Sequence, residues 1–161
     1  PDYIDQKFSR LDLKVYINDD IVNIELQVHF QGDYAERTLF YWSKLYSEQV
    51  KSAGAYGDTN KTICINILNF NLFECNDYFS FPSSSFKIME ENRHEILTDK
   101  FGIHFFELKK LNKNRKHKPV EEWLDLINAE TEGDLEMIES ETQVKDIRDI
   151  QLEIVLISNC E

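Results

Sequence analysis

Two acidic side chains and one amide near the start of the chain are spaced so that they could serve a divalent cation. Asp12 lies in the stretch RLDLKVYI, and Glu25 and Gln27 lie in the stretch IVNIELQV that follows it. Mg²⁺ prefers oxygen ligands, commonly takes one or two carboxylates and keeps several water molecules. A cation beside a phosphate polarises its oxygens and lowers the pKa of a bound water molecule, which an amide could orient. These residues could therefore support metal-assisted attack on a phosphate ester.

Both stretches alternate apolar and polar residues, which predicts two half-buried β-strands. Asp12, Glu25 and Gln27 all fall on the polar side. The apolar side, which the alternation makes a candidate for the core, consists of Leu11, Leu13, Val15, Ile17, Val22, Ile24, Leu26, Val28 and Phe30. The pattern leaves open which of the two faces a following helix covers.

The polar tip between the two strands predicts how they pair. A two-residue loop at Asp19 and Asp20 would set Asp12 opposite Gln27 and Lys14 opposite Glu25, and a four-residue loop over residues 18–21 would give the same pairing. A three-residue loop would place Asp12 opposite an apolar residue, which the alternation disfavours. We expect Asp12, Glu25 and Gln27 to share one patch. Alternation alone also allows a plain solvated hairpin face.

Composition indicates a globular protein whose acidity is confined to its tail. The chain has 161 residues, 42% of them hydrophobic, and a formal net charge of −12. Residues 119–161 carry thirteen acidic and two basic residues, so the remainder is almost neutral and a nucleic-acid partner is not excluded. The three cysteines have no close pair, which suits a reducing compartment, and no apolar run approaches the ~20 residues of a membrane span. We expect a cytoplasmic protein without a membrane partner.

The segments after the hairpin predict an α/β fold. A helix is expected over about Tyr34–Ser52, with Asp33 as its N-cap and Gly54 as its stop. Residues 61–73 are apolar on both sides, as interior strands are, so this strand should run parallel to the strand of Glu25. The buried face of the helix is expected to carry Ala35, Leu39, Trp42, Leu45, Tyr46 and Val50.

The rest of the chain predicts a second hairpin and further helices. SFKIMEE and KFGIHFFELKKL alternate around a polar tip at residues 92–95. A basic connector follows, Pro119 opens a helix, and the acidic stretch after it suggests one or two more. We therefore divide the chain into a core, residues 1–110, and a basic connector with an acidic helical tail, residues 111–161.

The ordered blocks RLDLKV, NIELQV, FQGDYAERTLFYWSKLYSEQ and ICINILNFNLF closely resemble the bacterial PD-(D/E)XK nuclease family transposases, also called recombination-promoting nucleases, over about residues 3–110. The resemblance implies a restriction-endonuclease-like α/β fold: a mixed β-sheet flanked by helices, here with an added β-hairpin and C-terminal helices. It also implies DNA cleavage with Mg²⁺, for which Mn²⁺ can substitute. Members usually carry a helix and a strand upstream of the strand with the motif aspartate, and we expect this chain to lack them.

Carried over residue by residue, the resemblance assigns Asp12 and Glu25 as the metal-binding acids and the carbonyl of Leu26 as a third ligand. Gln27 takes the position that holds Lys in the wider superfamily, where it would position water or phosphate. Because glutamine is neutral, the exchange removes a cation that would stabilise the attacking hydroxide. Asp12, Glu25 and Gln27 are thus the expected catalytic residues.

Contacts to DNA are expected from one side of the first helix. Arg37, Tyr41, Lys44, Glu48 and Lys51 form a stripe at spacings of three and four, and Arg37, Lys44 and Lys51 could face phosphates. An ordinary solvated helix face is the alternative, and the connector LKKLNKNRKHKP allows the same two interpretations.

Two functional hypotheses follow from these observations. The first is a metal-dependent DNA endonuclease that hydrolyses phosphodiester bonds in transposition or recombination. The second is a non-catalytic module with a nuclease fold, serving DNA binding or protein assembly. A homo-oligomer is left open by the sequence.

Overall fold

The computed structural model describes residues 10–30, 32–50, 54–73, 81–111, 119–129 and 132–141. The chain divides into two compact units, Pro1–Lys110 and Leu111–Glu161. The first unit contains β1 (Arg10–Ile17), β2 (Asp20–Gln27), α1 (Tyr34–Ser47), β3 (Thr62–Leu68), β4 (Ser83–Phe86) and β5 (Phe101–Glu107), with short 3₁₀ turns at Tyr56–Asp58 and Leu108–Lys110. The second contains α2 (Pro119–Ile127) and α3 (Glu132–Glu141).

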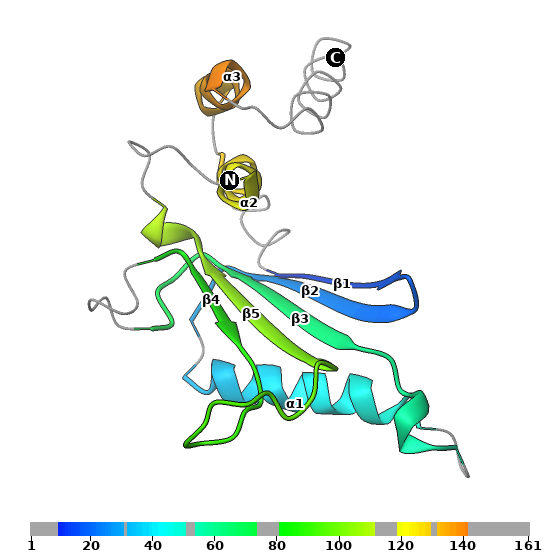
Figure 1. Ribbon diagram of the computed structural model, residues 1–161. Coiled ribbons are helices and arrows are strands. Elements are labelled where there is room, and N and C mark those ends of the chain that lie inside the picture. The colour runs from blue at the N-terminus through cyan, green and yellow to red at the C-terminus, as the bar shows by residue number, and fades with distance from the viewer. Residues whose placement is uncertain are drawn as a thin grey trace. The chain divides into compact units, whose positions relative to one another are not determined.

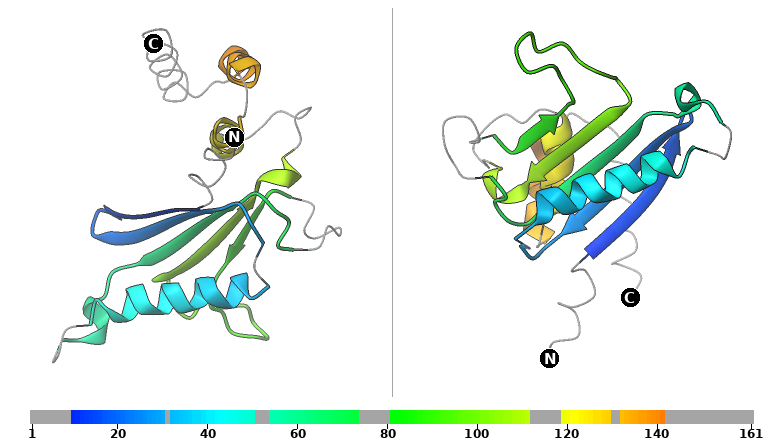
Figure 2. Two further views of the ribbon diagram at one scale, coloured as in Figure 1. Left: turned by 180° about the vertical axis from the view of Figure 1, so that it is seen from behind. Right: turned by 90° about the horizontal axis from the view of Figure 1, so that it is seen from below.

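The strands of the first unit form one mixed sheet in the order β1-β2-β3-β5-β4. β2, β3 and β5 run parallel, while β1 and β4 pair antiparallel at the two edges of the described sheet. α1 crosses one face of this sheet (Figures 1 and 2). The sequence-based expectation of an α/β fold with a mixed sheet, with the strands of Glu25 and Ile63 parallel, is confirmed.

The first hairpin forms, but its turn lies one residue earlier than expected. Asn18 and Asp19 form the two-residue loop, with φ angles of 49° and 73°. Such a loop needs positive φ at both positions, which asparagine and aspartate tolerate better than most residues. Asp12 therefore lies opposite Glu25 rather than opposite Gln27. The register differs from the expected one by two residues, so every side chain keeps its predicted face.

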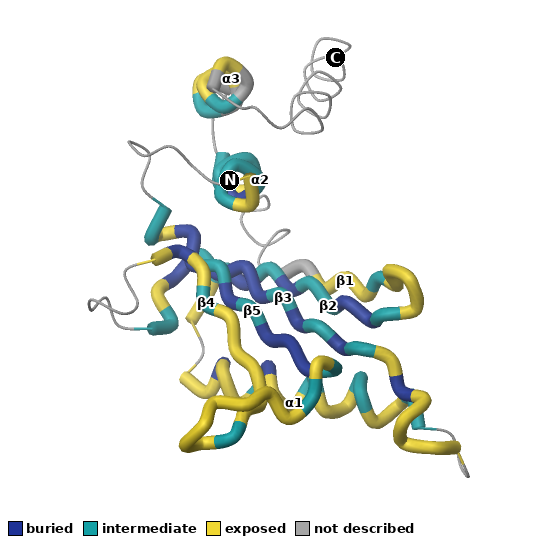
Figure 3. The backbone as a smooth tube through the Cα atoms, in the orientation of Figure 1, coloured by how far each residue is buried: buried dark blue, intermediate teal, exposed yellow. Residues whose placement is uncertain are grey.

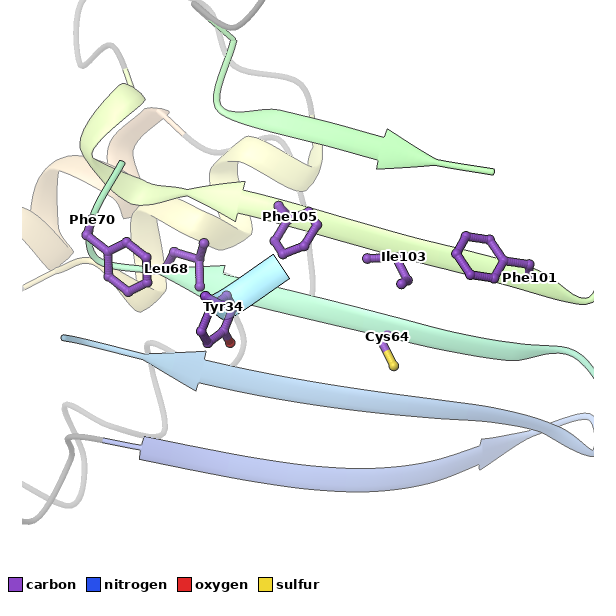
Figure 4. Close-up of a cluster of buried hydrophobic side chains, with 7 residues drawn as sticks. All are labelled: Tyr34, Cys64, Leu68, Phe70, Phe101, Ile103 and Phe105. Atoms are coloured by element: carbon purple, nitrogen blue, oxygen red, sulfur yellow. The ribbon is translucent and has the colours of Figure 1, made fainter. Parts of the chain in front are cut away.

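α1 lies on the side of the sheet that carries Glu25 and Gln27, a point that the sequence left open. Glu25 and Gln27 are only 3% and 5% exposed, whereas Leu13 and Ile17 on the opposite face are 45% and 56% exposed. Figure 3 shows the buried residues running along β2, β3 and β5, while the hairpin tip is exposed. Beside the polar positions, the α1-covered face holds an apolar cluster of Tyr34, Cys64, Leu68, Phe70, Phe101, Ile103 and Phe105 (Figure 4).

α1 begins where expected and ends earlier. Asp33 precedes it without a side-chain capping bond, and its last residue is Ser47 rather than Ser52. Beyond the helix, the side chain of Gln49 binds both the backbone N–H of Asn60 and the hydroxyl of Thr62, which draws the chain toward β3. The helix is also rotated relative to the predicted face, because Thr38 is buried while Leu39 is exposed.

A buried ion pair fastens the loop after β3 to the end of β5. Glu107 is fully buried, and its Oε1 accepts hydrogen bonds from the backbone N–H groups of Leu72 and Phe73 at 2.7 and 3.1 Å. Its Oε2 accepts a hydrogen bond from Lys110 Nζ at 2.7 Å, and the same ammonium donates to the carbonyl of Phe73 at 3.0 Å. The two buried charges are therefore paired with each other, and the backbone groups of the loop that face them are hydrogen-bonded.

The second hairpin and the tail helices also form. β4 pairs with β5, a single bridge joins Met89 and Ile96 farther along the arm, and residues 91–93 make the turn. α2 starts at Pro119, as predicted. The basic connector at residues 112–118 and the last twenty residues lie outside the described part of the chain. None of the described helices has the length and apolar character that a membrane crossing requires.

Candidate active site

Asp12 and Glu25 form the centre of the candidate site. They are direct partners across the β1–β2 pair, so their side chains leave the same face of the sheet. Directly opposed residues have Cβ atoms about 4.5–5.5 Å apart, close enough for two carboxylates to share a ligand. Asp12 is exposed and Glu25 is buried. The site is therefore open to solvent on one side and enclosed on the other.

The charges of both carboxylates affect the pKa of the Cys64 thiol. Cys64 lies on β3 beneath α1, and burial raises its pKa to about 12, with the negative charges of Glu25 and then Asp12 adding to the effect. The thiol therefore stays uncharged beside the two acids.

Gln27 lies two residues beyond Glu25 on the same face of β2. Its Nε2 donates a hydrogen bond to the carbonyl of His29 at 3.2 Å, which fixes the orientation of the amide, since that carbonyl needs a donor. Its Oε1 is buried and has no hydrogen-bond partner among the described residues. A buried acceptor left in this way costs about 1–3 kcal/mol. A water molecule or an ion within hydrogen-bond distance of Oε1 would remove this cost.

Arg37 reaches the site from α1. Its Nη2 donates to Glu25 Oε1 at 3.0 Å, and its side chain is 17% exposed. The guanidinium also lies over the rings of Tyr34 and Tyr41, 5.7 and 5.4 Å from their centroids. Sequence reasoning placed Arg37 on an outward stripe and missed its contact with Glu25.

A buried polar network sets the rotation of α1 that brings Arg37 to the site. Asn66 of β3 is the register partner of Glu25, and its Oδ1 lies 3.3 Å from the Tyr34 hydroxyl and 3.2 Å from the Thr38 hydroxyl. The amide nitrogen of Asn66 donates to the carbonyl of His104 at 3.1 Å. Polar residues at 34, 37 and 38 share one side of the helix. This spacing of polar residues on a helix that packs on partly polar strands could have identified Arg37 as a residue of the site.

The structure describes two of the three remaining candidates from the sequence. The side chain of Leu26 is half-buried on the opposite face, and its carbonyl stays a prediction as a ligand. Lys44 is exposed on α1. Lys51 lies outside the described residues.

The donors of the site are oxygen atoms from two carboxylates and one amide. The described residues contain no group of three or more His, Cys, Asp or Glu side chains arranged to hold a metal ion. A closed zinc site, with four nitrogen or sulfur ligands, is thus not what these residues offer. Two carboxylates with an unsatisfied buried amide oxygen fit a hard cation that keeps much of its water, as Mg²⁺ does.

Comparison with known proteins identifies the family of the chain. A family model described as PD-(D/E)XK nuclease family transposase matches residues 1–158. The curated proteins and the solved structures yielded no match.

Proposed function

Because the chain belongs to the PD-(D/E)XK nuclease family transposases, we propose that it is a metal-dependent DNA endonuclease that hydrolyses phosphodiester bonds in transposition or recombination. The observation that carries this proposal is the direct pairing of Asp12 with Glu25 on one face of the sheet. Two carboxylates side by side on neighbouring strands can bind one divalent cation together, as Mg²⁺ sites with one or two protein carboxylates do.

The proposed roles follow from where each group lies. Asp12 and Glu25 hold the ion, with the carbonyl of Leu26 as a third ligand, and the phosphate approaches from the solvent-exposed side of Asp12. When bound, Mg²⁺ or Mn²⁺ supplies a Lewis acid for the phosphate ester. The unsatisfied Oε1 of Gln27 accepts a hydrogen bond from the water that attacks phosphorus, which orients its lone pair.

DNA is the proposed substrate and partner. Lys44 on α1, together with Lys51 and the basic connector from the sequence, would contact phosphates without reading bases. The cytoplasm is the proposed location, because three cysteines without a close pair suit a reducing compartment. A second copy of the chain is a further partner to be tested.

A nicking assay with matched variants tests the proposal. The full-length protein should relax supercoiled plasmid with Mg²⁺ or Mn²⁺, and Asp12→Asn should lose at least about 10²-fold of that rate while its DNA affinity stays close to the parent's. Asp19→Asn is the control, because it makes the same change on the same hairpin at a turn position where asparagine is accepted. Equal rates for Asp12→Asn and the parent would contradict the proposal.

The alternative is a non-catalytic nuclease-fold module for DNA binding or protein assembly. One observation favours it: Glu25 already has an ion-pair partner in Arg37. On this alternative the full-length parent binds DNA or a partner protein but leaves plasmid intact with either ion, and Asp12→Asn behaves like the parent in every assay.

A further inference from the structure

The proposed reaction gathers more negative than positive charge at the site. Asp12, Glu25, a phosphodiester and an attacking hydroxide each bring one negative charge, whereas a single divalent cation brings two positive charges. Gln27 is neutral, and its amide nitrogen is already engaged with the carbonyl of His29. A further cation near the two acids would stabilise the charge that develops in the transition state.

Two basic side chains on this face can be compared directly. Lys14 is two residues from Asp12 on β1, but it is exposed and its ammonium lies 5.5 Å from the centroid of the Tyr16 ring, toward the hairpin tip. Arg37 lies 3.0 Å from Glu25 and is mostly buried. Of these two, the arginine is the one at the site.

Arg37 is held by rigid groups yet retains some exposure. The Tyr34 and Tyr41 rings lie one helical turn before and after it, and Tyr34 is itself fixed by its hydroxyl contact with Asn66. Arginine presents five N–H donors in a planar fork that matches the oxygens of a phosphate. A guanidinium aimed in this way can move from a carboxylate to an adjacent phosphate with little change in its side-chain position.

We propose that Arg37 is the cation of the candidate site: in the metal-free protein it neutralises Glu25, and with DNA bound it contacts the phosphate that is cleaved. This inference rests on the proposed nuclease function. It makes Arg37 a catalytic residue rather than a member of a general DNA-binding stripe. It also makes Arg37 and a divalent cation competitors for Glu25, since both are attracted to the same buried carboxylate.

Two measurements on Arg37→Gln separate this role from a structural one. The variant keeps a hydrogen-bond donor beside Glu25 but removes the charge. Mn²⁺ affinity, measured by calorimetry without DNA, should rise about fivefold or more because a competing cation is gone. Cleavage at saturating Mn²⁺ should fall about 10²–10³-fold. A purely structural arginine would instead lose metal affinity and cleavage together.

Lys14→Gln is the matched control, because it removes a positive charge from the same face without touching Glu25. It should change neither Mn²⁺ affinity nor cleavage by more than about twofold. Arg10, whose backbone lies opposite Gln27, is varied in parallel as Arg10→Gln. If this variant shows the opposed changes and Arg37→Gln does not, the inference is overturned.

A rescue experiment supplies the sharpest test. Gln27→Lys places an ammonium on β2 beside Glu25, so the double variant Arg37→Gln with Gln27→Lys should regain at least about tenfold in cleavage over Arg37→Gln alone. Because Gln27→Lys also removes the amide oxygen assigned to the water, the single variant Gln27→Lys is measured as well. If Arg37→Gln slows cleavage in the Gln27→Lys background as much as it does in the parent, the ammonium does not replace the guanidinium and the inference is overturned. If Arg37→Gln melts below the assay temperature, Arg37→Lys takes its place: it keeps the charge, so cleavage within about tenfold of the parent supports the role and inactivity opposes it.

The outcomes distinguish this inference from the proposed function. A parent that cleaves DNA while Arg37→Gln cleaves equally fast leaves the nuclease intact and refutes the role of Arg37. A full-length parent that never cleaves, and whose Asp12→Asn variant binds Mn²⁺ as well as it does, refutes both.

Discussion

Asp12 and Glu25 face each other across the β1–β2 pair, one exposed and the other buried. A divalent cation that binds both acids only in the folded protein should stabilise the fold. Mg²⁺ or Mn²⁺ at a free concentration of 100 Kd should add about 2.7 kcal/mol to the free energy of unfolding. Thermal melts check this: Asp12→Asn should lose the shift and Asp19→Asn should keep it. The same ion-induced shift in both variants would contradict a site at Asp12.

The Glu107–Lys110 ion pair should be essential to stability. Lys110→Met would leave the Glu107 carboxylate buried with two backbone donors but no counter-charge, which should cost about 3–5 kcal/mol of unfolding free energy. Urea denaturation measures the loss. Lys109→Met, the same change at the exposed neighbouring lysine, should cost less than about 0.5 kcal/mol. Similar losses in the two variants would show that the pair does not hold the loop.

The thiol of Cys64 should be inert in the folded protein. Burial, aided by the charges of Glu25 and Asp12, raises its pKa to about 12, so almost none of it is thiolate at pH 8. In a Cys75→Ser, Cys160→Ser background, iodoacetamide should leave the native protein unlabelled and label it fully in urea. Mass spectrometry reads the result, and rapid labelling of the native protein would show that Cys64 is not enclosed by α1.

His104 should make stability fall in mild acid. Its pKa is lowered by burial and then by the charges of Lys61 and Lys87, so the unfolded chain, with an ordinary pKa near 6.5, takes up this proton first. The unfolding free energy should therefore decrease as pH falls through about 6.5 and stop decreasing, for this group, below the pKa of the folded state.

Urea midpoints between pH 5 and pH 8 test the histidine effect. His104→Asn should flatten the dependence, whereas His94→Asn, at an exposed position with a φ of 57° that asparagine accepts, should leave it unchanged. An unchanged slope in His104→Asn would assign the acid sensitivity to other groups.

The sequence predicts the elements of the first unit well because each carries a local signal. Alternation identifies the two hairpins, and the apolar run around Ile65 identifies an interior strand. The alternation of the strands also predicts that Asp12, Glu25 and Gln27 share one face. This prediction holds although the predicted register is wrong, because a shift of two residues leaves each side chain on the same face.

What the sequence could not predict depends on contacts between distant segments. The turn position rests on which residues of the tip adopt positive φ, and three consecutive polar residues make that choice ambiguous. The burial of Glu25 depends on Arg37, Thr38 and Asn66, which lie between 12 and 41 positions farther along the chain. Amphipathic patterning assigns polar strand faces to solvent, so it fails where a helix supplies polar partners for them.

Asp12 belongs to a strand that has a neighbour on only one side within the described sheet, whereas Glu25 lies on a strand paired on both sides. Peripheral strands open locally at a lower free energy than the interior of a sheet. If β1 frays, Asp12 moves away while Glu25 stays paired with Arg37. A cation bound by both acids would therefore hold β1 against β2. The ordering of the sheet margin and the assembly of the site would then be a single event.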